Sequence, residues 1–75
     1  MNNRTMHLRH LDEVKRWIAE CERHITEQEQ RIVTLGPNGD DIAQAEQLLQ
    51  IFQQTQAQHI IHRDMILKEL DKWLP

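Results

Sequence analysis

Three pairs of potential metal ligands occur in the sequence, each with its members three residues apart: His7 with His10, Cys21 with His24, and His59 with His62. At this spacing both side chains of a pair lie on one face of an α-helix, as do the metal ligands of helical bundles. Nitrogen and sulfur ligands of this kind suit zinc. One hypothesis is therefore a zinc-type site formed by Cys21, His24, His59 and His62.

A purely structural interpretation of these residues is the stronger one. Five histidines in two helices produce such pairs by chance, and no carboxylate is obviously placed to orient a liganding imidazole. Cys21 is then a small core residue and His59 a polar residue at the helix interface. If His59 is buried in its neutral form, its protonation at low pH would oppose folding, because it would place a charge in the helix interface.

Catalytic chemistry has little support in this sequence. There is no serine, and Cys21 occupies an apolar position where burial raises the pKa of a thiol and weakens it as a nucleophile. No glycine-rich phosphate loop is present, and a two-helix rod offers no deep cleft. We therefore expect a protein that is not an enzyme and that needs no cofactor.

The element that must position these side chains is an amphipathic helix from about residue 5 to residue 35. Its seam advances in alternating steps of three and four residues, which is the heptad pattern of a packed helix: Leu11, Val14, Ile18, Cys21, Ile25, Gln28, Ile32 and Leu35. Gln28 is either a buried amide that fixes the register or a residue at a wet edge. Gly36-Pro37 ends the helix, because glycine tolerates positive φ and proline cannot continue it.

A second helix is expected from about residue 41 to residue 73. Asn38-Gly39 predicts a turn, and Asp41 with Gln44 resembles a capping box. Because the connection at residues 36–40 is short, the two helices are predicted to form one antiparallel, coiled-coil-like hairpin over residues 1–75. The expected core residues are Leu11, Val14, Ile18, Ile25, Ile32, Leu49, Phe52, Ile66 and Leu70.

The apolar surface of this hairpin exceeds what two helices can cover. The apolar residues of the second helix span an arc of roughly 140° at 100° per residue. Outside the main seam lie Trp17, Ile51, Ile61 and Met65, which we interpret as outer contact residues. The simplest arrangement is a two-fold homodimer that forms a four-helix bundle, and the alternative is that this patch binds a different protein.

Composition excludes several classes of protein. The 75 residues carry a net charge of −3, which argues against a nucleic-acid binder, and they contain no apolar run long enough to span a membrane. The single cysteine and the polar start of the chain favour a cytoplasmic location. Charge is uneven: residues 1–16 carry +2, residues 17–50 carry −5, and the remainder balances. Two hairpins could use this asymmetry to orient against each other.

Several short helical motifs resemble those of a group of small uncharacterised bacterial proteins of under a hundred residues. The motifs are His7-Leu8, Arg23-His24-Ile25, Gly39-Asp40, Ala45-Glu46 with Leu48-Leu49, Phe52, Thr55-Gln56, His59 and His62-Arg63-Asp64. The resemblance implies a helical hairpin and carries no activity. Cys21 stands where this group has a small residue such as glycine, so no cysteine-based function transfers. The sequence thus predicts a non-enzymatic protein–protein interaction module that works through apolar helix faces.

Overall fold

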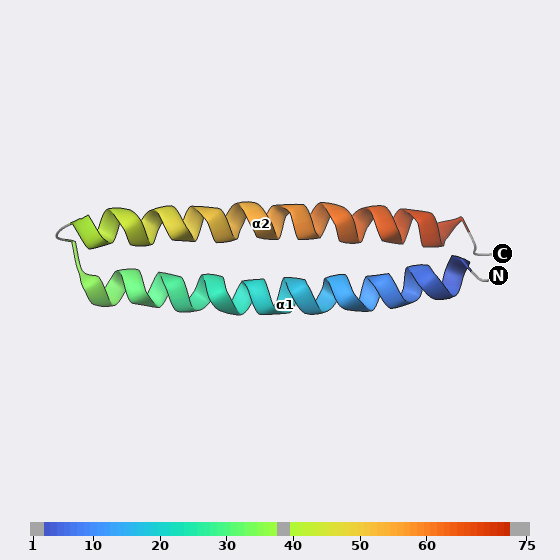
Figure 1. The fold of residues 1–75 in the computed structure, drawn as a ribbon, viewed down its shortest axis with the longest axis horizontal. Coiled ribbons are helices and arrows are strands. Elements are labelled where there is room, and N and C mark those ends of the chain that lie inside the picture. Colours follow the sequence, from blue (N-terminus) through green and yellow to red (C-terminus); the bar gives the residue numbers. More distant parts are fainter. Residues whose placement is uncertain (1–2, 38–39, 73–75) are drawn as a thin grey trace.

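The structure is a computed structural model that describes residues 3–37 and 40–72. Within them the chain forms two helices and no strand: α1 spans Asn3–Leu35 and α2 spans Asp40–Asp71. The helices lie side by side in opposite directions, with both termini at one end and the connection at the other (Figure 1). The predicted helical hairpin is therefore confirmed. The expected Asn38-Gly39 turn and Trp73 fall outside the described residues.

The end of α1 follows the predicted chemistry. Gly36 has a φ of 78° and its N–H donates a hydrogen bond to the carbonyl oxygen of Ile32 at 3.3 Å. This is the left-handed glycine cap that satisfies one of the last free carbonyls of a helix. The helix starts differ slightly from expectation, since α1 begins at Asn3 and α2 at Asp40. Arg4 does not prevent the early start, because a helix dipole opposes one exposed cation by less than about 1 kcal/mol.

The hairpin is long and thin, with extents of 57 × 18 × 14 Å. Its radius of gyration is 17.1 Å, whereas a compact chain of this length has about 11 Å. The accessible surface is 6076 Å², and a compact protein of the same mass exposes about 4,850 Å². Each chain therefore exposes roughly 1,200 Å² more than a compact fold would.

The apolar core lies mainly in the half of the hairpin that contains the termini. Leu11, Val14 and Ile66 form its buried centre, with Ile18 and Leu70 packed against it. Four other expected core residues are only half-buried: Ile25, Ile32, Leu49 and Phe52. Two helices alone cannot enclose a seam of large side chains, so a single apolar cluster is well covered in the part of the chain that the structure describes.

Three side chains cross between the helices to backbone carbonyl oxygens. Gln28 Nε2 donates to Ala45 O at 2.9 Å, Gln56 Nε2 donates to Ile18 O at 2.9 Å, and the Cys21 thiol donates to Phe52 O at 3.4 Å. Gln28 is thus a buried, satisfied amide rather than a residue at a wet edge. Because each accepting carbonyl has a second lone pair, it can take this bond beside its helical one.

The register of the two helices is close to the expected one. The ring of Trp17 lies against that of His59, and the ring of His24 lies against that of Phe52. The short connection at residues 36–40 predicts that Ile18 pairs with His59 and Ile25 with Phe52. The observed ring contacts differ from these pairs by one residue.

Candidate functional site

One long edge of α1 carries residues that recur every seven positions: His10, Trp17, His24 and Arg31. Such residues form a line beside the seam of a helix. The first three contact rings on α2. His10 meets His62 edge-on with centroids 4.7 Å apart, Trp17 lies 6.0 Å from His59, and His24 lies 5.8 Å from Phe52. These contacts place the line on one side of the hairpin.

The matching line on α2 is formed by Leu48, Thr55, His62 and Glu69, again seven residues apart. We call the side of the hairpin made by the two lines the aromatic face. It comprises His10, Trp17, His24, Arg31, Leu48, Thr55, His62 and Glu69, with Ile51 and Met65 beside the α2 line.

Three shallow, open hollows follow one another along the aromatic face. The central hollow is lined by Trp17, Glu20, Cys21, His24, Ile51, Phe52, Thr55 and His59. The terminal hollow is lined by His7, His10, His62, Met65, Ile66 and Glu69. The hollow near the connection is lined by Gln28, Arg31, Leu35, Asp41, Gln44, Ala45 and Leu48. Each hollow includes residues of the seam, so the interface between the helices is not closed on this side.

The expected outer contact residues are all exposed. Trp17 is 40% exposed, Ile51 53%, Ile61 52% and Met65 61%. Trp17, Ile51 and Met65 share the aromatic face. Ile61 lies one turn before Met65 and shares with it a further hollow on the outer side of α2, but unlike Met65 it borders none of the three hollows of the aromatic face.

Leu48 is a further exposed apolar residue of the aromatic face, at 37% exposure, and we had not expected it as a contact. The sequence places it within the broad apolar arc of α2, which suggested that it faces α1. The signal that identifies it is its position next to Leu49, since only one of two consecutive residues can occupy the seam.

The four proposed metal ligands are divided between two places. Cys21, His24 and His59 border the central hollow, whereas His62 packs against His10 and borders the terminal one. Over residues 3–37 and 40–72, no three side chains of the His, Cys, Asp or Glu types are grouped so that they could hold a metal ion. The geometry therefore gives the zinc hypothesis little support.

Polar atoms at the centre of the interface are incompletely satisfied. Burial raises the pKa of the Cys21 thiol, because the charged thiolate would lose its hydration. Gln56 Oε1 and His59 Nδ1 are buried and have no hydrogen-bond partner in the described structure. The centre of the interface is therefore more polar than the terminal core of Leu11, Val14 and Ile66.

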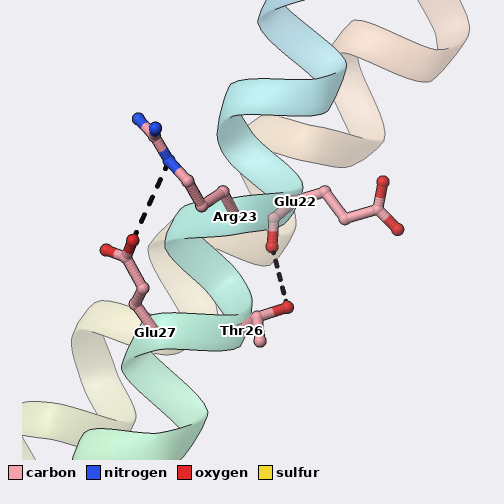
Figure 2. Close-up of polar contacts among 4 residues, drawn as sticks. All are labelled: Glu22, Arg23, Thr26 and Glu27. Atoms are coloured by element: carbon pink, nitrogen blue, oxygen red, sulfur yellow. Dashed lines mark hydrogen bonds and ion pairs between the residues drawn. The ribbon is translucent and has the colours of Figure 1, made fainter.

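The outward surface of α1 is solvated and polar. Figure 2 shows Arg23 paired with Glu27 at 3.8 Å and the Thr26 hydroxyl donating to the backbone carbonyl of Glu22 at 3.1 Å. Both side chains of the ion pair are about two-thirds exposed, so it adds little stability.

Charge differs strongly between the two halves of the rod. We define the terminal half as residues 1–19 and 56–75, and the connection half as residues 20–55. The terminal half carries seven basic and five acidic residues, which gives +2, and the connection half carries two basic and seven acidic residues, which gives −5. The rod is therefore an electrostatic dipole along its long axis.

The chain matches no protein-family model, no curated protein and no solved structure. Neither helix, as far as the described residues extend, is long and apolar enough to cross a membrane. The function must consequently be inferred from the surface of the hairpin itself.

Proposed function

We propose that this chain is a non-enzymatic protein–protein interaction module that dimerises through its aromatic face into a four-helix bundle. The observation that supports this most strongly is the imbalance between core and surface. Among the described residues, five apolar residues are buried, whereas eleven large hydrophobic side chains are exposed. A domain this small, without disulfides, usually needs a partner subunit to be stable.

The excess surface is of the size that an interface requires. Each hairpin exposes roughly 1,200 Å² beyond the area of a compact protein of its mass, and a standard interface removes about 800 Å² from each partner. Trp17 lies near the middle of α1 and borders the central hollow. A large aromatic side chain at the centre of an apolar face is the usual anchor of an interface.

The opposite side of the hairpin fits a partner less well. Its exposed apolar residues, Leu8, Ile60 and Leu67, all lie in the terminal half. Its connection half carries Glu22, Glu29 and Glu46 instead. The aromatic face, in contrast, has exposed apolar residues in both halves, with Trp17 and Met65 in the terminal half and Leu48 and Ile51 in the connection half.

The oligomeric state tests this proposal directly. We expect light scattering across a concentration series to give twice the chain mass of 9.0 kDa. Ile51→Glu places a charge on the aromatic face and should return the protein to 9.0 kDa. The matched control is Val33→Glu, because Val33 is 80% exposed and lies away from that face.

Two outcomes would overturn the proposal. One is a fully helical wild-type protein that remains at 9.0 kDa at every concentration. The other is a dimer that Ile51→Glu and Val33→Glu weaken equally. The first result would favour a different protein as the partner of the aromatic face.

Zinc binding by Cys21, His24, His59 and His62 is the second candidate function. One observation favours it: the first three residues border the same hollow. The separation of His62 from them speaks against it, and the effect of zinc on Tm tests it.

A further inference from the structure

The dimer proposed above leaves the relative direction of the two hairpins open. We infer that a second copy of this chain covers the aromatic face in the antiparallel orientation, with the two connections at opposite ends. The two-fold axis then crosses the rod near its middle. This inference rests on the proposed dimer and specifies its geometry from charge and from the positions of the exposed apolar residues.

Charge favours the antiparallel orientation. In a parallel dimer the connection half of one copy, with −5, lies beside the connection half of the other, also with −5. In an antiparallel dimer each connection half lies beside a terminal half of +2. Juxtaposed like charges weaken association and opposite charges steer it, so only one orientation is electrostatically complementary.

The positions of the exposed apolar residues on α2 also favour the antiparallel orientation. When two hairpins overlap fully about a crosswise two-fold axis, α2 of one copy lies on α2 of the other in the opposite direction. Because α2 spans Asp40–Asp71, Met65 of one copy then lies within a turn of Leu48 of its partner. Both residues are exposed in the single hairpin, and this contact covers them.

The parallel orientation pairs these residues poorly. There α1 of one copy lies on α2 of the other, in the register that the hairpin itself shows. Met65 would then face the region of His10, and Leu48 would face the stretch between His24 and Arg31. An apolar side chain over polar or charged groups gains little from burial and removes those groups from water.

Trp17 is placed at the centre by the same symmetry. Since α1 spans Asn3–Leu35, its midpoint is at Ala19, two residues from Trp17. In the antiparallel dimer the two Trp17 side chains are four residues apart, which is about 6 Å along the rod. Each indole then lies beside the central hollow of the partner, where Ile51 and Phe52 are also accessible.

Distance measurement between spin labels tests the orientation. We place a label at Thr34→Cys, near the connection, in a Cys21→Ser background that retains a hydroxyl donor for the Phe52 carbonyl. The antiparallel dimer separates two such labels by about 30 residues along the rod, or about 45 Å. The parallel dimer brings them within about 25 Å.

A label at Ala19→Cys is the matched control, because residue 19 lies near the two-fold axis and gives a short distance in either orientation. A short Ala19 distance with a Thr34 distance near 45 Å supports the inference. Short distances at both positions would overturn it and leave the dimer intact. Absence of any dipolar coupling at both positions would instead overturn the dimer itself.

Cross-linking provides a second test that does not depend on labels. In the Cys21→Ser background, the double variant Leu48→Cys, Met65→Cys should oxidise to a covalent dimer. These positions are 17 residues apart on one helix, about 25 Å, so they cannot bridge within a chain. Neither single variant should cross-link. A double variant that keeps the dimer mass and forms no disulfide would contradict the antiparallel orientation.

Discussion

The two halves of this hairpin differ in how completely their apolar side chains are buried, although each has a glutamine that donates to a carbonyl oxygen of the other helix. In the terminal half, Leu11, Val14 and Ile66 are buried in an apolar cluster. In the connection half, the large seam residues remain half-buried, and Gln28 and Cys21 instead donate to backbone carbonyls of α2. A regular heptad pattern therefore does not by itself produce a core that is equally buried along its whole length.

Small residues explain part of this difference. Ala45 and Cys21 are buried in the connection half, and both are short enough to let the helix backbones approach. A close approach brings carbonyl oxygens within reach of Gln28 and Cys21. Ile25 and Ile32 then lie at the edge of the helix interface, and both are half-buried.

The largest expected effect is a difference between the two halves in the free energy of unfolding that an isoleucine of the helix interface contributes. Ile66→Ala removes a side chain that is only 7% exposed, and we expect a loss of about 3 kcal/mol. Ile32→Ala makes the same chemical change at a half-buried site, where about 1 kcal/mol is expected because less apolar area is lost. Urea unfolding followed by circular dichroism, at one fixed protein concentration, measures both. Equal losses would show that the two halves are equally well packed.

A smaller effect is expected for the polar contact in the connection half. Gln28→Ala deletes the bond to the Ala45 carbonyl, and the loss should be about 1 kcal/mol because the carbonyl keeps its helical partner. Gln30→Ala is the control, since Gln30 is exposed and on the same helix. Identical unfolding midpoints for the two variants would mean that the buried amide contributes nothing.

Much of this fold follows from the sequence. The alternation of three and four residues in α1, together with Gly36-Pro37, is sufficient to predict two antiparallel helices. The residues Trp17, Ile51, Ile61 and Met65 are exposed, and their role as outer contact residues stays a prediction. The helix starts were less predictable, because dipole and capping effects at the ends are each small.

The details of the aromatic face could not be read from periodicity alone. Ile61 lies outside the main arc, like the other expected outer residues, but it borders a hollow on the outer side of α2 and none of the three hollows of the aromatic face. Whether Gln28 is buried depends on how closely the helices approach, and heptad spacing does not report that distance. Similarly, spacing of three residues placed His62 beside His59 on α2 without showing that its ring packs on His10.

Alkaline pH should weaken the connection half more than the terminal half. Burial raises the pKa of the Cys21 thiol above its ordinary value, so the protonated thiol is favoured in the folded state. Its contribution to stability is full below the unfolded pKa and is lost as the pH rises through the folded pKa. We expect stability to fall at alkaline pH in the wild type and to fall less in Cys21→Ala. Matching pH profiles for the two proteins would contradict this.

The smallest expected effect is that of zinc. A bound zinc ion would stabilise the connection half and so reduce the difference in stability between the two halves. Cys21 and His24 belong to the connection half, and His59 and His62 to the terminal half, so a shared ion would link them. His62 packs on His10 instead. We therefore expect Tm to change by less than about 1 °C when equimolar zinc is added, and likewise when a chelator is added in a separate sample. Tight binding would produce a much larger shift. A rise in Tm that is abolished in Cys21→Ala would establish the metal site. A rise that persists in Cys21→Ala would show that zinc binds elsewhere than at the proposed four residues.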